Sequence, residues 1–143
     1  MDVGRICTRE VDLAEPDETA VVAAQRMLQR NVGSLVVLDA KKKPVGIVTD
    51  RDLCLRVMAK GVDAAQVQVR DVLTPHPHCI PEHASVNGAL GLMRDVGVRR
   101  VLVVDDDQHL VGLLALDDIV DVLCEQGALV RAVIAKEGPR TLS

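Results

Sequence analysis

The sequence contains no phenylalanine, tyrosine or tryptophan, and this absence removes one large class of binding surface. Proteins that bind single-stranded nucleic acids stack bases on aromatic side chains. Proteins that bind phosphate backbones normally have a surplus of basic residues. This sequence has 17 lysines and arginines and 21 aspartates and glutamates, for a formal net charge of −4. We therefore do not expect a nucleic-acid partner. Any nucleobase that this protein holds must lie among aliphatic side chains, backbone groups and guanidinium planes.

Long apolar runs are missing as well. No stretch approaches the roughly 18 residues that a membrane-spanning helix needs. The first residues carry Asp2 and Arg5, and these charges come too early to allow the apolar stretch of a signal peptide. We expect a soluble cytoplasmic protein with no membrane partner.

Motifs for catalysis are lacking. There is no G-x-S-x-G, no phosphate-binding P-loop and no H-E-x-x-H. Cys7, Cys54, Cys79 and Cys124 form no C-x-x-C pair and have no identifiable base beside them. In a protein that is not exported, such scattered cysteines are usually small buried apolar residues rather than disulfides. We expect no enzymatic activity and no catalytic cofactor.

What is present is an apolar and repetitive chain. Of its 143 residues, 48% are hydrophobic and 27% charged, which excludes intrinsic disorder and leaves one compact unit or two very small ones. A shift of 66 positions lays one half on the other, so that Thr8 falls on Thr74 and Met27 on Met93. Val45-Gly46 likewise falls on Val111-Gly112. A period of this size indicates a duplicated small domain rather than a solenoid.

Each copy has the pattern β-α-β-β-α. Thr19 and Ser85 are expected N-caps, because each stands directly before apolar residues at helical spacing. The expected segments of the first copy are an extended piece at 11–16, a helix from 20, strands at 35–38 and 45–48, and a second helix over 53–58. Those of the second copy are 78–81, a helix from 86, strands at 101–104 and 111–114, and a helix over 119–124.

The two copies are expected to form one α+β body. A unit of about 60 residues buries too little surface to be stable alone, and its strands are continuously apolar, so both sheet faces need cover. We therefore expect the copies to pack around a pseudo-two-fold axis. The predicted division is 3–61 for the first domain, 62–70 for a linker, 71–127 for the second domain and 128–143 for a short C-terminal helix and tail.

These features resemble a known family. The doubled β-α-β-β-α order, the segment Gly46-Ile47-Val48-Thr49-Asp50-Arg51-Asp52 and the run from Gly97 to Asp105 are together similar to the CBS domain in a stand-alone tandem pair, a Bateman module. Thr49-Asp50-Arg51-Asp52 and the extra C-terminal helix also resemble small bacterial two-CBS proteins of the hypoxic-response type. The resemblance implies a regulatory binding fold for adenosine-containing ligands, with AMP, ADP or ATP ahead of S-adenosylmethionine or NAD.

The resemblance further implies a ligand site between the copies, with one competent pocket. In the family's pattern a hydroxyl serves ribose or phosphate and an acid serves the ribose hydroxyls; Thr49 and Asp52 supply both here. Arg99 and Arg100 would face them from the second copy, and arginine suits phosphate because its fork gives paired charge-assisted hydrogen bonds. The predicted ligand-binding residues are Gly46, Ile47, Val48, Thr49, Arg51, Asp52, His76, Pro77, His78, Cys79, Arg99 and Arg100.

The opposite pocket is predicted to be weaker. Its residues would be Gly33, Ser34, Ala115 and Asp118, where Ala115 lacks the hydroxyl of Thr49, and Gly33 and Ser34 offer no cation. A purely structural interpretation also stands. Thr49 would then be a helix N-cap and Asp52 a first-turn acid that complements the helix dipole, with Arg99 and Arg100 as solvated charges.

The histidines suggest a metal site at first. His76, His78, Cys79 and His83 lie close in sequence. Pro77 favours an extended backbone there, in which His76 and His78 share a face and Cys79 does not, while zinc needs four converging ligands. We expect no metal, and we expect this segment to line the nucleobase side of the competent pocket.

The predicted function is therefore the sensing of an adenine nucleotide by a homodimer. The alternative is a ligand-free dimerisation scaffold, and a thiol or metal redox responder is a third hypothesis.

Overall fold

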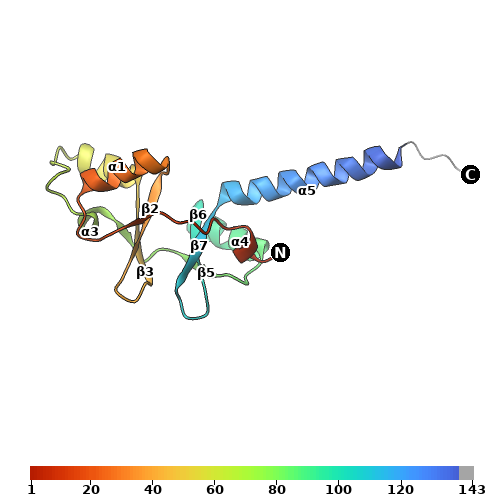
Figure 1. Ribbon diagram of the computed structural model, residues 1–143, viewed down its shortest axis with the longest axis horizontal. Coiled ribbons are helices and arrows are strands. Elements are labelled where there is room, and N and C mark those ends of the chain that lie inside the picture. Colours follow the sequence, from red (N-terminus) through yellow and green to blue (C-terminus); the bar gives the residue numbers. More distant parts are fainter. Residues whose placement is uncertain (139–143) are drawn as a thin grey trace, which may run out of the picture.

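Figure 1 shows the computed structural model, which describes residues 1–138. The β-α-β-β-α order occurs twice, as predicted. The first repeat consists of β1 (Leu13–Ala14), α1 (Ala20–Arg30), β2 (Ser34–Leu38), β3 (Pro44–Thr49) and α2 (Asp50–Leu53), which a π-helical turn, η2 (Cys54–Met58), continues. The second consists of β5 (Cys79–Pro81), α4 (Val86–Val96), β6 (Arg100–Val104), β7 (Leu110–Ala115) and α5 (Leu116–Glu137).

The first helix of each repeat begins and ends as its sequence requires. Thr19 accepts a hydrogen bond from the Val22 amide in α1, and Ser85 accepts one from the Gly88 amide in α4, so both predicted N-caps are confirmed. Both helices end at a residue with left-handed backbone, Asn31 in α1 and Gly97 in α4.

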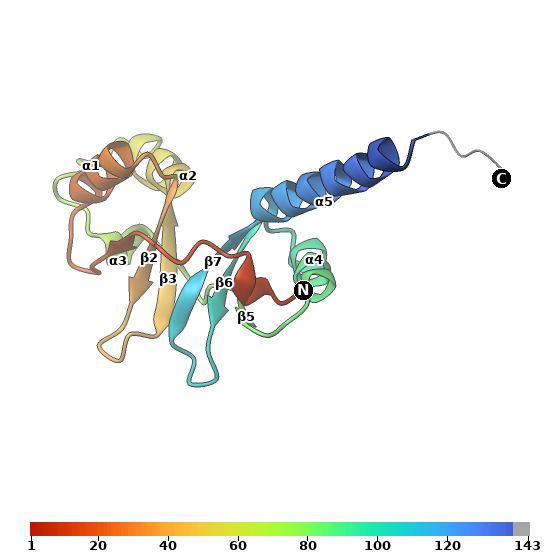
Figure 2. The same cartoon turned by 45° about the vertical axis from the view of Figure 1, so that its right-hand side comes forward.

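Each repeat contains its own sheet. In the first, β1 runs parallel to β2, β2 antiparallel to β3, and β3 antiparallel to the short strand β4 (Thr74–Pro75). In the second, β5 runs parallel to β6, and β6 antiparallel to β7. The two sheets lie side by side, with α1 and α2 at one end of the molecule and α4 at the other (Figure 2).

The leading segment of each repeat packs against the other repeat. Helix α3 (Val69–Val72) precedes the second repeat in sequence, yet Val69 and Val72 are buried in the core of the first. The 3-10 turn η1 (Val3–Arg5) precedes the first repeat, and Val3 is buried in the core of the second. The end of the segment expected as a linker over 62–70 is thus core structure. This exchange ties the two repeats into one unit.

Two equivalent glycines permit the exchanged segments to approach. A Cβ on Gly46 would lie 2.7 Å from the Leu73 side chain, and a Cβ on Gly112 would lie 2.6 Å from the backbone oxygen of Thr8. Thr8 pairs with Leu113 just as Thr74 pairs with Ile47. At Gly112 the neighbour is backbone, so only glycine allows this approach, whereas at Gly46 a larger residue would first have to displace the flexible Leu73 side chain.

Helix α5 differs from the expected C-terminal architecture. We predicted that a second-repeat helix would end near Gly127 and that a short separate helix would follow, but one continuous helix runs from Leu116 to Glu137. An isolated glycine costs a helix only about 1 kcal/mol, and no proline intervenes before residue 139. The helix ends at Gly138, which has a φ of 68°. No described helix is long and apolar enough to cross a membrane.

The cysteines are free thiols, and the expectation that they are buried is wrong for three of them. Cys54, Cys79 and Cys124 are exposed, and only Cys7 is partly buried. Burial raises the pKa of the Cys7 thiol above its usual range. Cys54 and Cys124 lie on helical surfaces that nothing in a single chain covers.

Candidate functional site: a cleft between the repeats

A cleft of about 370 Å³ lies between the two repeats. It is formed where β3 ends, where the chain passes from β4 to β5, and where β6 begins. Thr49 from the first repeat and Arg99 and Arg100 from the second all line it. The volume falls in the range of about 300–1,000 Å³ that is usual for small-molecule sites. The sequence predicted that a hydroxyl and an acid of the first repeat would face two arginines of the second across a shared crevice. Thr49, Arg99 and Arg100 do line this cleft, but Asp52 does not.

Thr49 has a structural role and a free hydrogen. Its Oγ1 accepts a hydrogen bond from the Asp52 amide at 3.1 Å, which caps α2. A hydroxyl has one donor hydrogen and two acceptor sites. No residue among 1–138 accepts the hydrogen of Thr49, so it is available to an acceptor in the cleft, such as a phosphate oxygen.

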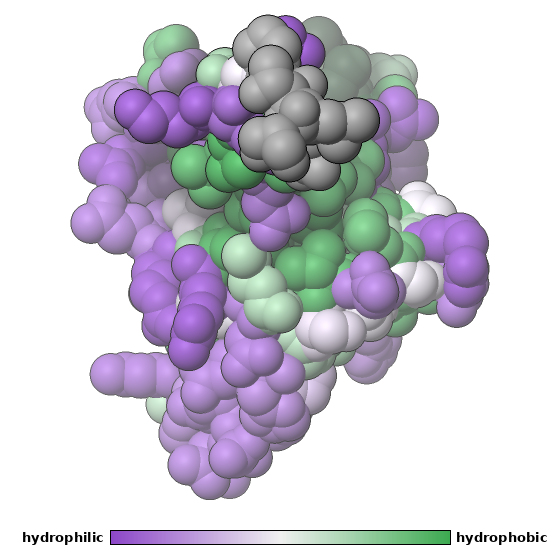
Figure 3. Space-filling model, turned by 90° about the vertical axis from the view of Figure 1, so that its right-hand side faces the viewer, coloured by the Kyte–Doolittle hydropathy of each residue, from purple (hydrophilic) through white to green (hydrophobic). Residues whose placement is uncertain are grey.

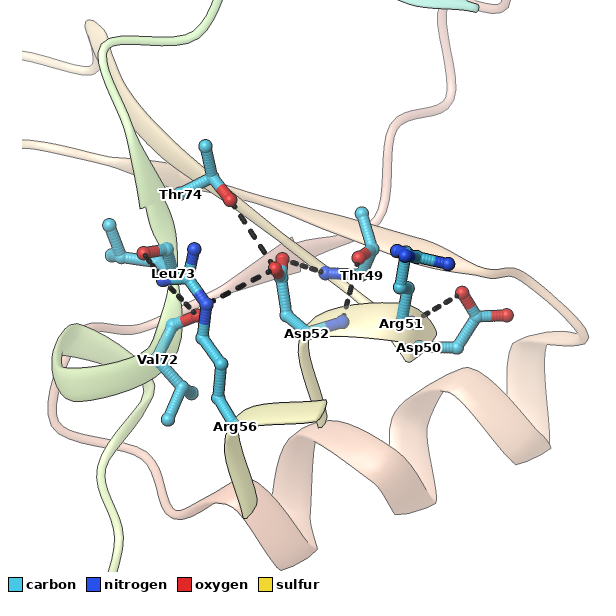
Figure 4. Close-up of polar contacts among 8 residues, drawn as sticks. All are labelled: Thr49, Asp50, Arg51, Asp52, Arg56, Val72, Leu73 and Thr74. Atoms are coloured by element: carbon cyan, nitrogen blue, oxygen red, sulfur yellow. Dashed lines mark hydrogen bonds and ion pairs between the residues drawn. The ribbon is translucent and has the colours of Figure 1, made fainter. Parts of the chain in front are cut away.

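Both carboxylate oxygens of Asp52 interact with other groups of the protein (Figure 4). One carboxylate oxygen accepts from the Thr49 amide at 2.9 Å, completing a reciprocal capping box. The other accepts from the Thr74 hydroxyl at 3.3 Å and lies 3.7 Å from Nε of Arg56. Asp52 is 9% exposed and does not line the cleft. This arrangement is the structural interpretation given for Asp52 above, and it links α2 to the exchanged segment that carries Thr74.

The two arginines are exposed and differ in their partners. Nη2 of Arg99 lies 3.5 Å from Asp117 at the start of α5, in an ion pair whose side chains are both largely in solvent. Such pairs contribute little, so Arg99 can turn toward a ligand at small cost. Arg100 forms no ion pair with any residue that the structure describes.

The segment from His76 to Cys79 is less regular than predicted. His76 has a φ of 53°, so the expected extended backbone is wrong at this residue and the chain turns between β4 and β5. His76, Pro77 and His78 line the cleft, but Cys79 does not. The carbonyl oxygen of His78 accepts from the Leu102 amide at 2.9 Å and is thus held by β6. Cys79 is exposed as a residue, yet desolvation on its protein-facing side raises the pKa of its thiol.

Other predicted residues lie outside the cleft. Gly46 contacts the exchanged segment instead, and Val48 is buried in the core of the first repeat. Arg51 is exposed and is not part of the lining. Ile47 does line the cleft, as predicted.

Six of the thirteen residues that line the cleft were not predicted from the sequence. They are Thr74, Pro75, Val98, Val101, Leu102 and Leu113. Thr74 and its repeat equivalent Thr8 occupy matching places in the two clefts, and their identity across the repeat was the one hint to them in the sequence. The remaining aliphatic residues give the cleft the walls expected around a nucleobase in a chain without aromatics.

A second cleft of about 220 Å³ lies on the other side of the pair. It contains Gly33, Ser34, Ala115 and Asp118, so the structure brings together the residues predicted for the weaker site. Its lining also includes Arg100, so the expected lack of a cation is wrong. Strand β6 places the Arg100 guanidinium within reach of both clefts; a Cβ on Gly33 would lie 3.7 Å from its Nη2. Glu10 and Asp12 make this cleft more acidic than the first.

Potential metal ligands gather away from the clefts. Within residues 1–138, the one trio whose ligand atoms lie within 4.8 Å of one another is Asp105, Asp107 and His109, at the β6–β7 hairpin. Asp105 accepts from the amides of Asp107 and His109, as Asp39 accepts from those of Lys41 and Lys43 in the first repeat. Because the lysine-bearing hairpin has the same hydrogen bonds, they belong to the turn and do not indicate a metal.

Comparison with known proteins establishes the family. The model of the CBS domain matches residues 3–59 and 69–125, so the chain belongs to the CBS-domain family as a tandem pair. Hypoxic response protein 1 of Mycobacterium tuberculosis is 29% identical over 143 residues, which are 100% of this chain and 94% of that protein. A crystal structure of hypoxic response protein I with two coordinated zinc ions has a TM-score of 0.75 at 26% identity, covering 85% of this chain and 98% of that one.

Two further relatives extend this picture. An uncharacterized protein of Methanopyrus kandleri is 37% identical over 85% of this chain, which spans 62% of that protein. A CBS domain protein from Pyrobaculum aerophilum, solved in complex with AMP, has a TM-score of 0.74 at 25% identity and covers 82% of this chain and 89% of that one.

Proposed function

We propose that this CBS pair is a non-catalytic cytoplasmic sensor of adenine nucleotides, with AMP as the simplest ligand, held in the cleft that Thr49, Arg99 and Arg100 line. The observation that carries the proposal is that Thr49 and two exposed arginines, Arg99 and Arg100, line one cleft of about 370 Å³. Binding of AMP by the Pyrobaculum relative supports the ligand class.

The chemistry of the cleft suits a nucleoside monophosphate. Arg99 and Arg100 supply the charge for the phosphate, and the hydroxyl of Thr49 supplies a directed hydrogen bond. Val98 and Leu113 offer aliphatic surface to the base. Asp52 does not contact the ligand in this arrangement; it fixes the hydroxyl of Thr49 through the capping box. A ligand that bridges both repeats would favour one relative orientation of the pair.

Isothermal titration calorimetry tests the proposal with AMP and with adenosine, which lacks the phosphate. The double variant Arg99→Gln/Arg100→Gln should lose at least tenfold in AMP affinity and bind adenosine unchanged. The matched control is Lys41→Gln/Lys42→Gln, which removes the same charge at the β2–β3 hairpin, outside both clefts, and should bind AMP like the wild type.

The competing function is a scaffold that binds no nucleotide. It is favoured if the wild type shows neither binding heat nor thermal stabilisation with AMP, ADP, ATP, S-adenosylmethionine or NAD. A true ligand at 100 times its Kd stabilises the fold by about 2.7 kcal/mol, which a thermal-shift assay detects readily. Equal AMP affinity of both double variants would also refute the assignment of the arginines.

A further inference from the structure

The guanidinium of Arg56 holds the exchanged segment that leads into the larger cleft (Figure 4). Its Nη1 donates to the backbone oxygen of Leu73 at 3.1 Å and to that of Val72 at 3.4 Å. Its Nε lies 3.7 Å from Oδ1 of Asp52, and the same oxygen accepts a hydrogen bond from the Thr74 hydroxyl at 3.3 Å. We call these five residues the clamp, because they tie the α2–η2 helix to the segment that precedes β5.

The backbone oxygens of the clamp lie at the end of a helix. Helix α3 ends at Val72, and the last carbonyl groups of a helix have no partner within it. Arginine side chains near a helix C-terminus can donate to these groups. Arg56 therefore caps α3 from a different element, and this cap fixes the point at which the chain leaves α3 and enters β4.

A π-helical turn carries Arg56. In the first repeat η2 follows α2, whereas the equivalent residues of the second repeat belong to the regular helix α5. Single π turns within helices are frequent at functional sites. Val57 in η2 is buried in the core of the first repeat, where α3 also lies, while its equivalent Leu123 in α5 is 57% exposed. Hydrophobic surface accordingly gathers around the projecting end of α5 (Figure 3), and the π turn keeps its own helix close to the core and to α3.

The second repeat has no equivalent of the clamp among the described residues. Val122 occupies the position that corresponds to Arg56. Asp118 keeps its bond from a backbone amide, but within residues 1–138 no hydrogen bond joins it to Thr8, which lies on the segment exchanged in the opposite direction. Asp118 and Thr8 line the smaller cleft instead. The two clefts therefore differ in how their walls are held as well as in their charges.

The clamped segment forms one wall of the larger cleft. Residues 74–78, which begin with the last residue of the clamp, all line it. At one end of this wall β4 pairs with β3, and at the other the backbone oxygen of His78 accepts from the Leu102 amide. Between these ends the chain turns at His76, whose φ is 53°. Connecting segments are more mobile than the elements that they join, so the conformation of the wall depends on how its ends are fixed.

We propose that Arg56 is a positioning residue of the nucleotide site, which holds the wall 74–78 in its binding conformation without touching the ligand. This inference rests on the function proposed for the cleft. A wall that is ordered before binding removes an ordering cost from the affinity. Because Arg99 and Arg100 meet the phosphate in that proposal, the wall contacts the nucleoside. Loss of the clamp should therefore weaken the binding of AMP and of adenosine by the same factor.

Isothermal titration calorimetry with AMP and with adenosine provides the first test. Arg56→Met keeps the aliphatic part of the side chain and removes its donors, and it should weaken both ligands about fivefold, the size of the ordering cost of one or two side chains. Arg56→Lys restores a cationic donor and should recover most of the affinity. The matched control is Arg26→Met, which removes a guanidinium and its ion pair with Glu18 from α1, outside both clefts. It should bind both ligands like the wild type.

Hydrogen–deuterium exchange without nucleotide tests the wall itself. The backbone amides within residues 74–78 should exchange faster in Arg56→Met than in the wild type and in Arg26→Met. All titrations are made at a temperature at which circular dichroism shows every variant folded, because a purely structural contribution then leaves the Kd unchanged. Unchanged exchange at the wall, unchanged affinity of Arg56→Met, or a loss confined to AMP would overturn the proposal. If the wild type binds neither ligand, the function proposed for the cleft fails and Arg56 retains only the ordering of the wall, which the exchange experiment decides.

Discussion

Asp52 and its equivalent Asp118 allow the contribution of one side chain to be measured against an internal control. Each stands third in the first turn of a helix and accepts a hydrogen bond from a backbone amide at 2.9 Å, that of Thr49 for Asp52 and of Ala115 for Asp118. Asp52 alone also accepts from the Thr74 hydroxyl and faces Arg56. Asp52→Ala should therefore destabilise the fold by more than Asp118→Ala.

The expected difference follows from the extra contacts. Loss of the shared capping contact costs about 1 kcal/mol in both variants. The hydrogen bond from Thr74 is long for a bond to a carboxylate and is worth about 1 kcal/mol, and the ion pair with the half-exposed Arg56 adds about 0.5 kcal/mol. We expect a loss of unfolding free energy of about 2.5 kcal/mol for Asp52→Ala and about 1 kcal/mol for Asp118→Ala.

Urea denaturation followed by far-UV circular dichroism measures both values, since the chain has no tryptophan for fluorescence. The gap of about 1.5 kcal/mol should separate the two midpoints by roughly 1 M urea at an m-value in the usual range. An Asp118→Ala variant as unstable as Asp52→Ala would show that the contacts to Thr74 and Arg56 contribute nothing. An Asp52→Ala variant as stable as the wild type would contradict the structural role of this carboxylate altogether.

Three further predictions concern glycines and acid stability. Gly97→Ala should destabilise the fold by about 1 kcal/mol because the φ of Gly97 is 71°. Gly91→Ala, inside α4 with open space at its Cβ position, should instead stabilise the fold by about 0.5–1 kcal/mol. Chemical denaturation measures both changes in unfolding free energy, and two changes of the same sign would refute the argument. Gly112→Ala should cost about 1–3 kcal/mol through overpacking against backbone, and a wild-type midpoint would contradict the close approach. Hydrogen bonds from Arg26 hold the pKa of Glu18 below its usual range. The stability that this pair adds is therefore present above the unfolded pKa of about 4.3 and is lost as pH falls through the lower folded pKa. The difference in unfolding free energy between the wild type and Arg26→Gln should shrink below about pH 4, and a difference that does not change with pH would exclude the ion pair as its cause.

The fold was predictable because the duplication repeats every local signal. Thr19 and Ser85 mark the same helix start twice, and the apolar strands recur at the same offset, so each assignment had an independent confirmation within the chain. The exchange of η1 and α3 was not predictable, because helical segments of three or four residues have no periodicity that shows which core they enter. The left-handed His76 between two prolines was missed for a similar reason, since its conformation is imposed by the chain turning between sheets.

The residues of the site were predicted only in part, for a different reason. Through its resemblance to the CBS family, the sequence placed Thr49, Arg99 and Arg100 around one cleft between the repeats, and all three line it. It could not decide between a ligand contact and a cap for Asp52, because an acid in the third position of a helix fits both. The partners that decide, Thr74 and Arg56, come from an exchanged strand and from the next helical turn. The length of α5 was not predicted because the single glycine Gly127 was interpreted as the end of a helix, whereas the helix continues through it.

The first turn of α2 connects the cleft proposed for the nucleotide to a second hollow, the apolar groove of about 590 Å³ between α1 and the α2–η2 helix. Thr49 lines the cleft, and Asp50, the next residue, lines the groove. The capping box pairs Thr49 with Asp52 in both directions and so makes these residues one rigid turn. A ligand that displaced Thr49 in the proposed site would therefore also displace Asp50 and with it the wall of the groove.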